Sequence, residues 1–344
     1  AELRDKRKKF LDGVVTPQND ISFCCSMSIS RKIYDQNRQS LVTSRSKYRT
    51  VNLVKKQDIS SELERLLVDP DLKLLPWVGV SMQEENGEDG NHQPPSGRVF
   101  CFLPLPESER TGLPIHVHGY FGLGDNRRSI KWPDRESEHD KAARWNQLLT
   151  QEAFPDAFVQ LVKEAIDDGV PPSTVYTAWP DVSNLNKQWS TGVRNFLQKV
   201  TRLPVIYTAA AGGRWLKPGD VLVNSRNDDL IYRVLLRKGC PVASVPDHVI
   251  RALQWGNVET KGVTPEIVRE AIRGDTLDWL NDAERLQLLE YVLEDGQFHD
   301  LHNIKLLPLE DGDFTTFSRS AATVYMPSDD IPSELFPDMS NRFV

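Results

Sequence analysis

The segment ISFCCSMSIS, residues 21–30, decides the class of fold. It alternates apolar and small polar side chains with a period of two, which is typical of a strand with one buried face. We therefore expect a half-buried strand, with its apolar residues on one face and its serines on the other. Comparable strand patterns follow at 41–54, 77–82, 99–103 and 115–123. Their hairpin-like connections predict an antiparallel or mixed sheet.

The predicted strands are followed in the sequence by segments with the spacing of amphipathic helices. Ser137 and Asp140 resemble a capping box at the start of a helix, and we expect Trp145 to be buried on the apolar face of that helix. A second helix is predicted from Pro155 to Gly169, because a glycine commonly ends a helix. Its predicted buried stripe is Phe158, Leu161, Val162, Ala165 and Ile166.

The second half of the chain predicts a smaller subdomain and then a helical C-terminal part. A strand–helix–strand unit is expected at 219–245, helices at 264–274 and 282–296, and a strand–turn–strand around Asp-Gly at 306–314. The fold class is therefore α+β or mixed α/β. The predicted buried stripe of the 282–296 helix, which Asp282 caps, is Leu286, Leu289 and Leu293.

Three parts are expected along the chain. Residues 1–12 form a basic lead-in from a preceding domain, residues 13–170 a sheet-plus-helices unit, and residues 171–344 a second α/β and helical unit. Residues 84–96 are rich in Glu, Gly, Asn and Pro. That composition predicts a mobile and dispensable hairpin loop.

Composition narrows the class of protein. The 344 residues are 39% hydrophobic and 26% charged, as in a folded globular protein, and no segment approaches the ~20 apolar residues that span a bilayer. Residues 1–57 hold 13 basic and 5 acidic residues although the net charge is −7. These residues contain no nucleic-acid-binding motif, so nucleic acid is not an expected partner. A membrane is not expected either, because no segment is apolar enough to span one. Four scattered cysteines favour a reducing cytoplasm over a disulfide framework.

Motifs of the common enzymes are missing. The sequence has no GxxxxGKS/T, no GxGxxG after a strand, no GxSxG and no HExxH. His116 and His118 have a spacing that metal sites use, which leaves an independent metal-dependent hydrolase as an alternative. Because no further ligand lies nearby in sequence, the favoured interpretation is the polar outer face of a half-buried strand, with no metal and no cofactor.

The most distinctive motifs occur in a fixed order. They are FLPLP at 102–106, TGLPIHVHGYF at 111–121, NRRS at 126–129 and RWNQLL at 144–149. In this order they resemble the sacsin repeat, a unit of a giant neuronal protein implicated in a spastic ataxia. The resemblance extends over roughly residues 75–320, which makes it more specific than any single motif.

The resemblance implies a position within a larger machine. Each repeat of that family opens with an ATP-binding domain like that of the ninety-kilodalton heat-shock chaperone, and this chain resembles the middle segment that follows. It lacks the Asn-bearing helix and the DxGxG loop of the ATP domain, so the isolated chain is expected to be non-catalytic and not to bind ATP. By position, the phosphate-sensing candidates toward the adjacent ATP-binding domain are Arg144 and Gln147, or Arg127 and Arg128.

The function that the resemblance implies is that of a cytoplasmic co-chaperone. The chain would be a middle portion of a repeat that handles client proteins and regulates the seventy-kilodalton heat-shock machinery. The implied partners are clients, that heat-shock chaperone system and the adjacent ATP-binding domain. A passive structural spacer is the remaining alternative.

Overall fold

A computed structural model describes residues 5, 8–10, 12, 19–35, 40–85, 96–134, 140–318, 324–327 and 337–344. The chain divides into two compact units, each described here by itself. Unit 1 comprises residues 1–205 and 246–259, and unit 2 comprises residues 206–245 and 260–344. The division therefore falls near residue 205, whereas the sequence predicted a boundary near residue 170. The predicted domains at 13–170 and 171–344 remain a prediction.

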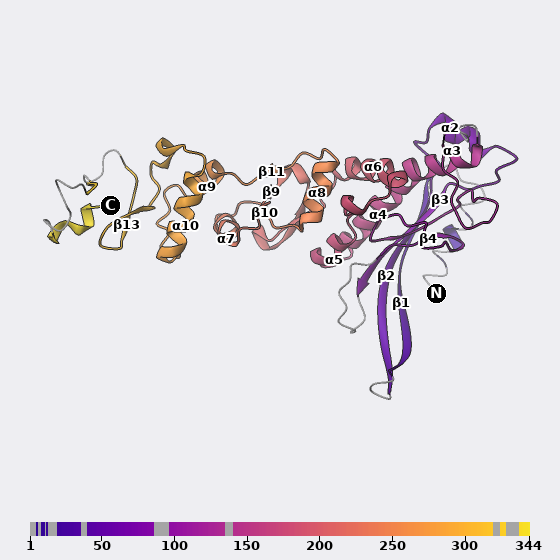
Figure 1. The fold of residues 1–344 in the computed structure, drawn as a ribbon, viewed down its shortest axis with the longest axis horizontal. Coiled ribbons are helices and arrows are strands. Elements are labelled where there is room, and N and C mark those ends of the chain that lie inside the picture. The colour runs from indigo at the N-terminus through magenta and orange to yellow at the C-terminus, as the bar shows by residue number, and fades with distance from the viewer. Residues whose placement is uncertain are drawn as a thin grey trace. The chain divides into compact units, whose positions relative to one another are not determined.

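Unit 1 is built on a six-stranded mixed sheet (Figure 1). The strand order is β1-β2-β3-β6-β4-β5, with β4 parallel to β6 and the other pairs antiparallel. This confirms the predicted α+β class with a mixed sheet. The strands are β1 (Ile21–Asp35), β2 (Ser40–Val54), β3 (Trp77–Glu85), β4 (Val99–Cys101), β5 (Leu103–Pro104) and β6 (His116–Gly119).

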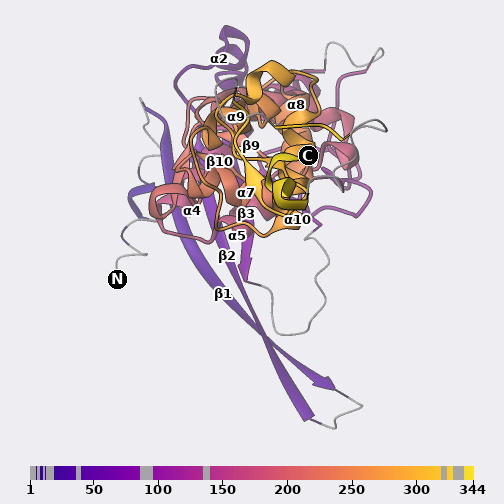
Figure 2. The same ribbon diagram turned by 90° about the vertical axis from the view of Figure 1, so that its left-hand side faces the viewer.

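The β1–β2 hairpin is much longer than the rest of the sheet. Its two strands pair in continuous register from Ile21↔Val54 to Asp35↔Ser40, but β3 pairs with β2 only as far as Lys47. The two strands therefore extend beyond β3 as a twisted ribbon (Figure 1 and Figure 2). The predicted strands at 21–30 and 41–54 are thus confirmed as a hairpin and are longer than expected.

A helical layer covers one face of this sheet. Its main members are α3 (Lys141–Leu148), the π-helical turn η1 (Leu149–Ala153) and α4 (Phe154–Asp167). The predicted stripe of α4 is confirmed, because Phe158, Leu161 and Ala165 are fully buried. Trp145 of α3 is also fully buried, as predicted. The layer packs on Val51, Val78, Val80 and Met82 of the sheet, which are buried too.

The remaining described helices of unit 1 are short. They are α2 (Ser61–Leu67), α5 (Pro172–Thr177), η2 (Val182–Asn184), η3 (Lys187–Trp189), α6 (Ser190–Val200) and α8 (Asp247–Trp255). No helix in the described ranges is both long and apolar enough to span a membrane.

The apolar face of β1 is half-buried at Phe23, as the period-two pattern predicts, and exposed at Met27 and Ile29. Met27 lies directly opposite Tyr48 and Phe23 opposite Asn52, whereas the helix α4 hydrogen-bonds from Gln160 to Ser22 on the other face. The apolar residues of β1 therefore lie on the side away from α4. An alternating pattern separates two faces of a strand, but it does not say which face a helical layer will cover.

Two local predictions near the sheet also change. Asp140, rather than Ser137, is the N-cap of α3, and its carboxylate accepts from the backbone N–H groups of Ala142 and Ala143; Ser137 lies outside the described residues. Of the predicted loop 84–96, residues 86–95 lie outside the described residues as well. Glu84 belongs to β3 and is buried, so the segment is not uniformly a loop.

The lead-in predicted at 1–12 is described only at residues 5, 8–10 and 12, all of them helical. Phe10 is buried, with its ring 6.2 Å from that of Phe23 and 5.4 Å from that of Trp77. The described part of the lead-in is therefore anchored to the sheet, while its connection to a preceding domain stays a prediction.

Unit 2 contains the predicted strand–helix–strand motif. β9 (Leu222–Val223) is parallel to β10 (Val242–Ala243), and α7 (Asp229–Arg237) connects them. The predicted hairpin is present as β12 (Leu307–Pro308) and β13 (Phe314–Thr315). The other elements are β7 (Ile206–Thr208), η4 (Ala210–Gly212), β8 (Arg214–Leu216), η5 (Pro218–Asp220), β11 (Lys261–Gly262), α9 (Pro265–Ile272), α10 (Asp282–Leu293), η6 (Phe298–Leu301) and η8 (Pro337–Arg342).

Helix α10 corrects two predictions. Asn281, not Asp282, is its N-cap and forms a reciprocal capping box with Glu284. Its buried residues are Leu288, Tyr291 and Val292. Of the predicted stripe, Leu289 and Leu293 are partly buried against the same core, whereas Leu286 is exposed. Both stripes satisfy helical spacing, so the choice between them depends on where α7 and α9 lie. The core of unit 2 forms between these three helices.

Candidate functional site

The sheet face away from α4 is lined with apolar and aromatic side chains. Opposite residues of an antiparallel pair share a face, and the register places the odd-numbered residues of β1 on this one. Met27 is 47% exposed and Ile29 is 52% exposed. Phe10 covers part of this face at Phe23 and Trp77. We call the following set the open face: Phe23, Cys25, Met27, Ile29, Tyr48, Thr50, Asn52, Trp77, Gly79, Ser81, Phe100, His116 and His118.

A hollow of about 340 Å³ lies in the middle of the open face. Gly79 forms its floor, and a Cβ at that position would lie 2.9 Å from the Asn52 side-chain oxygen. Met27 and Ile29 line one side, and Phe100 and His116 line the other. The hollow therefore has apolar and aromatic walls that belong to strands far apart in the sequence, and it is large enough for a partner's side chain.

An aromatic cluster occupies the end of the open face near β6. The Trp77 ring stacks on Tyr120 at 5.6 Å and lies 5.8 Å from His118. Phe102 is exposed and meets Tyr120 edge-to-face at 4.7 Å. Aromatic surfaces of this kind bury a large apolar area with little loss of conformational entropy, which suits them to protein contacts.

The two histidines of the open face act as hydrogen-bond acceptors. His116 Nδ1 accepts from the backbone N–H of Arg98 at 3.0 Å, and His118 Nε2 accepts from that of Phe102 at 3.3 Å. Burial lowers the pKa of both rings below the usual value, and the Arg98 charge lowers that of His116 further. The described residues contain no group of three side chains able to hold a metal, so the geometry brings no third ligand to this pair.

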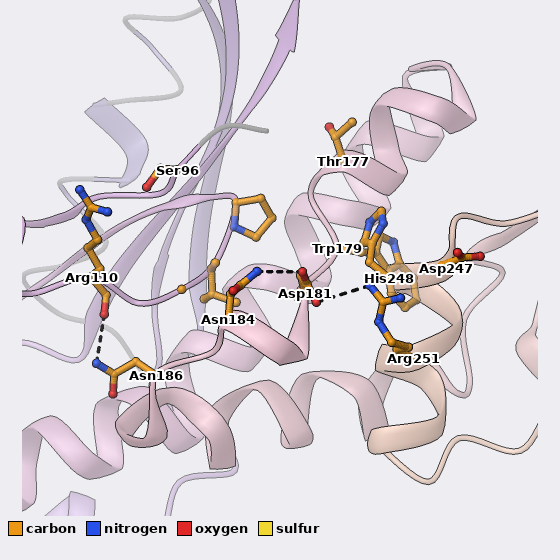
Figure 3. Close-up of a pocket in the computed structure, with 13 residues that line it drawn as sticks. Ser96, Arg110, Thr177, Trp179, Asp181, Asn184, Asn186, Asp247, His248 and Arg251 are labelled. Atoms are coloured by element: carbon orange, nitrogen blue, oxygen red, sulfur yellow. Dashed lines mark hydrogen bonds and ion pairs between the residues drawn. The ribbon is translucent and has the colours of Figure 1, made fainter. Parts of the chain in front are cut away.

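A second, polar pocket of about 940 Å³ lies elsewhere in unit 1 (Figure 3). Asp181 accepts from Asn184 at 2.9 Å and lies 3.8 Å from the guanidinium of Arg251. Burial would raise the pKa of Asp181, but the Ser183 backbone N–H and Arg251 lower it below its usual range. His248 Nε2 lies 2.9 Å from the Tyr176 carbonyl oxygen. These polar groups bond to other groups of the protein, and the arrangement indicates that they hold the surrounding loops in place.

The predicted phosphate-sensing residues form two separate groups. The Arg144 guanidinium donates from Nε to Glu62 at 2.6 Å and from Nη1 to the Gln147 side-chain oxygen. Its pKa is raised, chiefly by the hydrogen bond to Glu62. Arg127 and Arg128 are exposed in the turn after β6, which the Arg127 N–H closes onto the Gly124 carbonyl. Contact of any of the four with a phosphate stays a prediction.

The RWNQLL motif has a structural role that its sequence did not disclose. Trp145 Nε1 donates to the Tyr120 carbonyl at 2.8 Å. The buried Asn146 accepts from the Gly122 N–H and donates to the carbonyl groups of Gly122 and Lys131. The motif therefore fixes the chain after β6 onto α3, which also explains why it accompanies the TGLPIHVHGYF motif.

Sequence reasoning missed the open face and the polar pocket as sites. The pocket residues Asp181, His248 and Arg251 come from distant segments with no local motif. The open face did leave a signal, because Phe23, Met27 and Ile29 alternate with serine and cysteine. The alternation indicates a half-buried strand, but it does not show which part of the apolar face stays uncovered.

No family model and no solved structure matches the chain. Human sacsin is 32% identical to it over 356 aligned residues, which cover 96% of this chain and 8% of sacsin. The chain thus spans less than a tenth of the length of the relative it matches. Identity at this level over nearly the whole chain accords with the order of motifs from β4 to α3, and the chain is a sacsin-related region.

Proposed function

We propose that this region is a non-catalytic part of a large co-chaperone and that it contacts client proteins through the open face. The observation that supports the proposal is the exposure of Met27 and Ile29 on a face that also carries Trp77, Tyr48 and Phe100. Monomeric proteins rarely leave a contiguous apolar patch without a binding role. Non-native clients expose apolar segments that such a patch can shield.

The setting of this activity is proposed from the relationship to sacsin. The partners would be client proteins, the seventy-kilodalton heat-shock machinery and an adjacent ATP-binding domain of the same chain, in the cytoplasm. Nucleotide chemistry would belong to that ATP-binding domain.

Suppression of client aggregation tests the proposal. The chain is added without nucleotide to a reporter enzyme unfolding on mild heating, and light scattering is followed. We expect the wild type to suppress scattering and the double variant Met27→Ser/Ile29→Ser to lose most of that effect. The matched control is Val68→Ser, which alters a residue that is 82% exposed beyond the end of α2 and away from the sheet.

Three results would count against the proposal. Equal suppression by the wild type and the double variant would exclude the open face as the client site. No suppression by the wild type would favour a passive spacer. Hydrolytic activity that depends on added metal and is lost in His116→Ala would favour the hydrolase alternative.

A further inference from the structure

The outer edge of β1 is unpaired along its whole length in the part of the chain that the structure describes. β1 is the first strand of the sheet and pairs with β2 alone. None of the described backbone hydrogen bonds outside the strand pairs involves β1. An unpaired edge presents a row of N–H and C=O groups that can pair with another extended chain.

Most of the usual protections of an edge strand are missing from the described part of β1, although the exposed Lys32 supplies a charge. The strand is 15 residues long, against about 5–6 in a typical strand. Its sequence contains no proline, and its register with β2 shows no bulge. Natural edge strands are normally short, bulged or interrupted by proline. β1 is therefore a template for pairing as well as an element of the sheet.

The side chains of β1 indicate what such an added strand would carry. On the open face, a new strand would place alternate side chains beside Cys25, Met27 and Ile29, which favours apolar residues there. On the other face its neighbours would be small, because the even-numbered residues include Ser22, Ser26, Ser28 and Ser30. Cross-strand and diagonal neighbours of this kind set the preference of a paired strand.

The charge of the hairpin indicates the charge that a partner segment should carry. Among the described basic side chains of the hairpin, Lys32 and Arg45 are exposed, whereas Lys47 and Arg49 are paired with Glu84. A second copy of the chain would bring the same positive charge to the edge, which opposes self-pairing. An acidic segment would be attracted instead, because complementary charge favours encounter and fixes register.

We propose that β1 binds an extended acidic segment of a client protein as an added antiparallel or parallel strand, with alternate apolar side chains covering Met27 and Ile29. The proposal deepens the proposed function and rests on it for the identity of the partner as a client. In this arrangement, the unpaired N–H and C=O groups of β1 would form hydrogen bonds with the backbone of the client, which the side chains of the open face alone cannot provide.

Synthetic peptides test strand addition directly. The probe is a fluorescently labelled peptide in which valine or isoleucine alternates with glutamate, and its binding to the whole chain is followed by anisotropy. Two derivatives carry N-methyl groups on alternate residues, one on the odd set and one on the even set. In an edge pair only every second amide of the added strand faces the neighbouring strand.

Strand addition predicts an asymmetric result. One methylated derivative loses at least about tenfold in affinity, while the other stays within about threefold of the parent peptide, because only one set of amides pairs. A peptide with lysine in place of glutamate binds at least about tenfold more weakly. Met27→Ser/Ile29→Ser weakens binding, and Val68→Ser does not.

Other results overturn the inference. If both methylated derivatives bind equally, the peptide docks without backbone pairing. If the lysine peptide binds as well as the glutamate peptide, the charge assignment is wrong. If light scattering shows a dimer that the peptide cannot dissociate, β1 pairs with a second copy. If the chain still suppresses client aggregation in the face of any of these results, the proposed function stands and only strand addition is excluded. If the methylated peptides bind asymmetrically but client aggregation is not suppressed, only the proposed function is excluded.

Discussion

Replacing Arg49 with methionine should destabilise unit 1 strongly. The Arg49 side chain is 5% exposed, and its Nε donates to Glu84 at 2.6 Å. Glu84 is itself 3% exposed, so removing the guanidinium leaves a buried carboxylate. Lys47 Nζ remains 2.8 Å from Glu84, but its side chain is 37% exposed and replaces the lost charge only in part.

The magnitude follows from the burial of both partners. Breaking a buried ion pair by removing one member costs about 3–5 kcal/mol, and the remaining Lys47 places the expected loss near the lower end, at about 3 kcal/mol. The second contact of Arg49, to Asp168 at the end of α4, adds little because Asp168 is mostly exposed. Arg49→Met/Glu84→Met should recover most of the loss, since an apolar pair of similar volume is often tolerated.

Urea unfolding followed by circular dichroism gives the free energies, and hydrogen exchange at β2 and β3 reports the same region locally. Arg110→Met is the matched control, because Arg110 pairs with Glu107 at 2.7 Å on the surface and should cost less than about 1 kcal/mol. The reasoning fails if Arg49→Met lies within about 1 kcal/mol of the wild type, or if the double variant is no more stable than the single one.

Three further outcomes are expected. Trp145→Ala should lower the free energy of unfolding by about 3–5 kcal/mol, as a fully buried indole is removed; a loss under about 1 kcal/mol in urea titrations would contradict this. Burial lowers the folded-state pKa of His116 and His118, so the unfolded chain binds protons first and stability should fall as pH drops below about 6.5. Melting temperatures of a His116→Gln/His118→Gln variant should then depend less on pH, and an unchanged slope would refute the assignment. In unit 2, Arg269→Met should lower the free energy of unfolding because the buried guanidinium donates two bonds to Asp295 and one to the Val292 carbonyl. A loss in urea titrations that Asp295→Ala does not match would show that packing dominates.

Local patterns predicted those elements whose neighbours are close in sequence. The α4 stripe of Phe158, Leu161 and Ala165 and the β9–α7–β10 unit needed only spacing and terminating glycines. The turn of the last hairpin followed from Asp311-Gly312, where Gly312 has a φ of 91°, a value that glycine adopts without strain.

What the sequence could not supply is the partner of each face. Arg49 meets Asp168 across 119 residues, and Arg144 meets Glu62 across 82 residues. Neither pairing has a local signature. The sequence also leaves open which side of β1 faces the helical layer, because a period of two is unchanged when the covered side is exchanged.

The Arg144 network shows how a residue's structural partners limit what its mutation can prove. In a longer protein that includes the ATP-binding domain, Arg144→Ala would remove any phosphate contact and also the ion pair that joins α3 to α2 through Glu62. Loss of hydrolysis alone would therefore not separate the two roles. Glu62→Gln removes the ion pair and leaves the guanidinium. A phosphate-contacting Arg144 would keep or increase hydrolysis in Glu62→Gln because its side chain is released, whereas a purely structural Arg144 would make both substitutions lower hydrolysis alike.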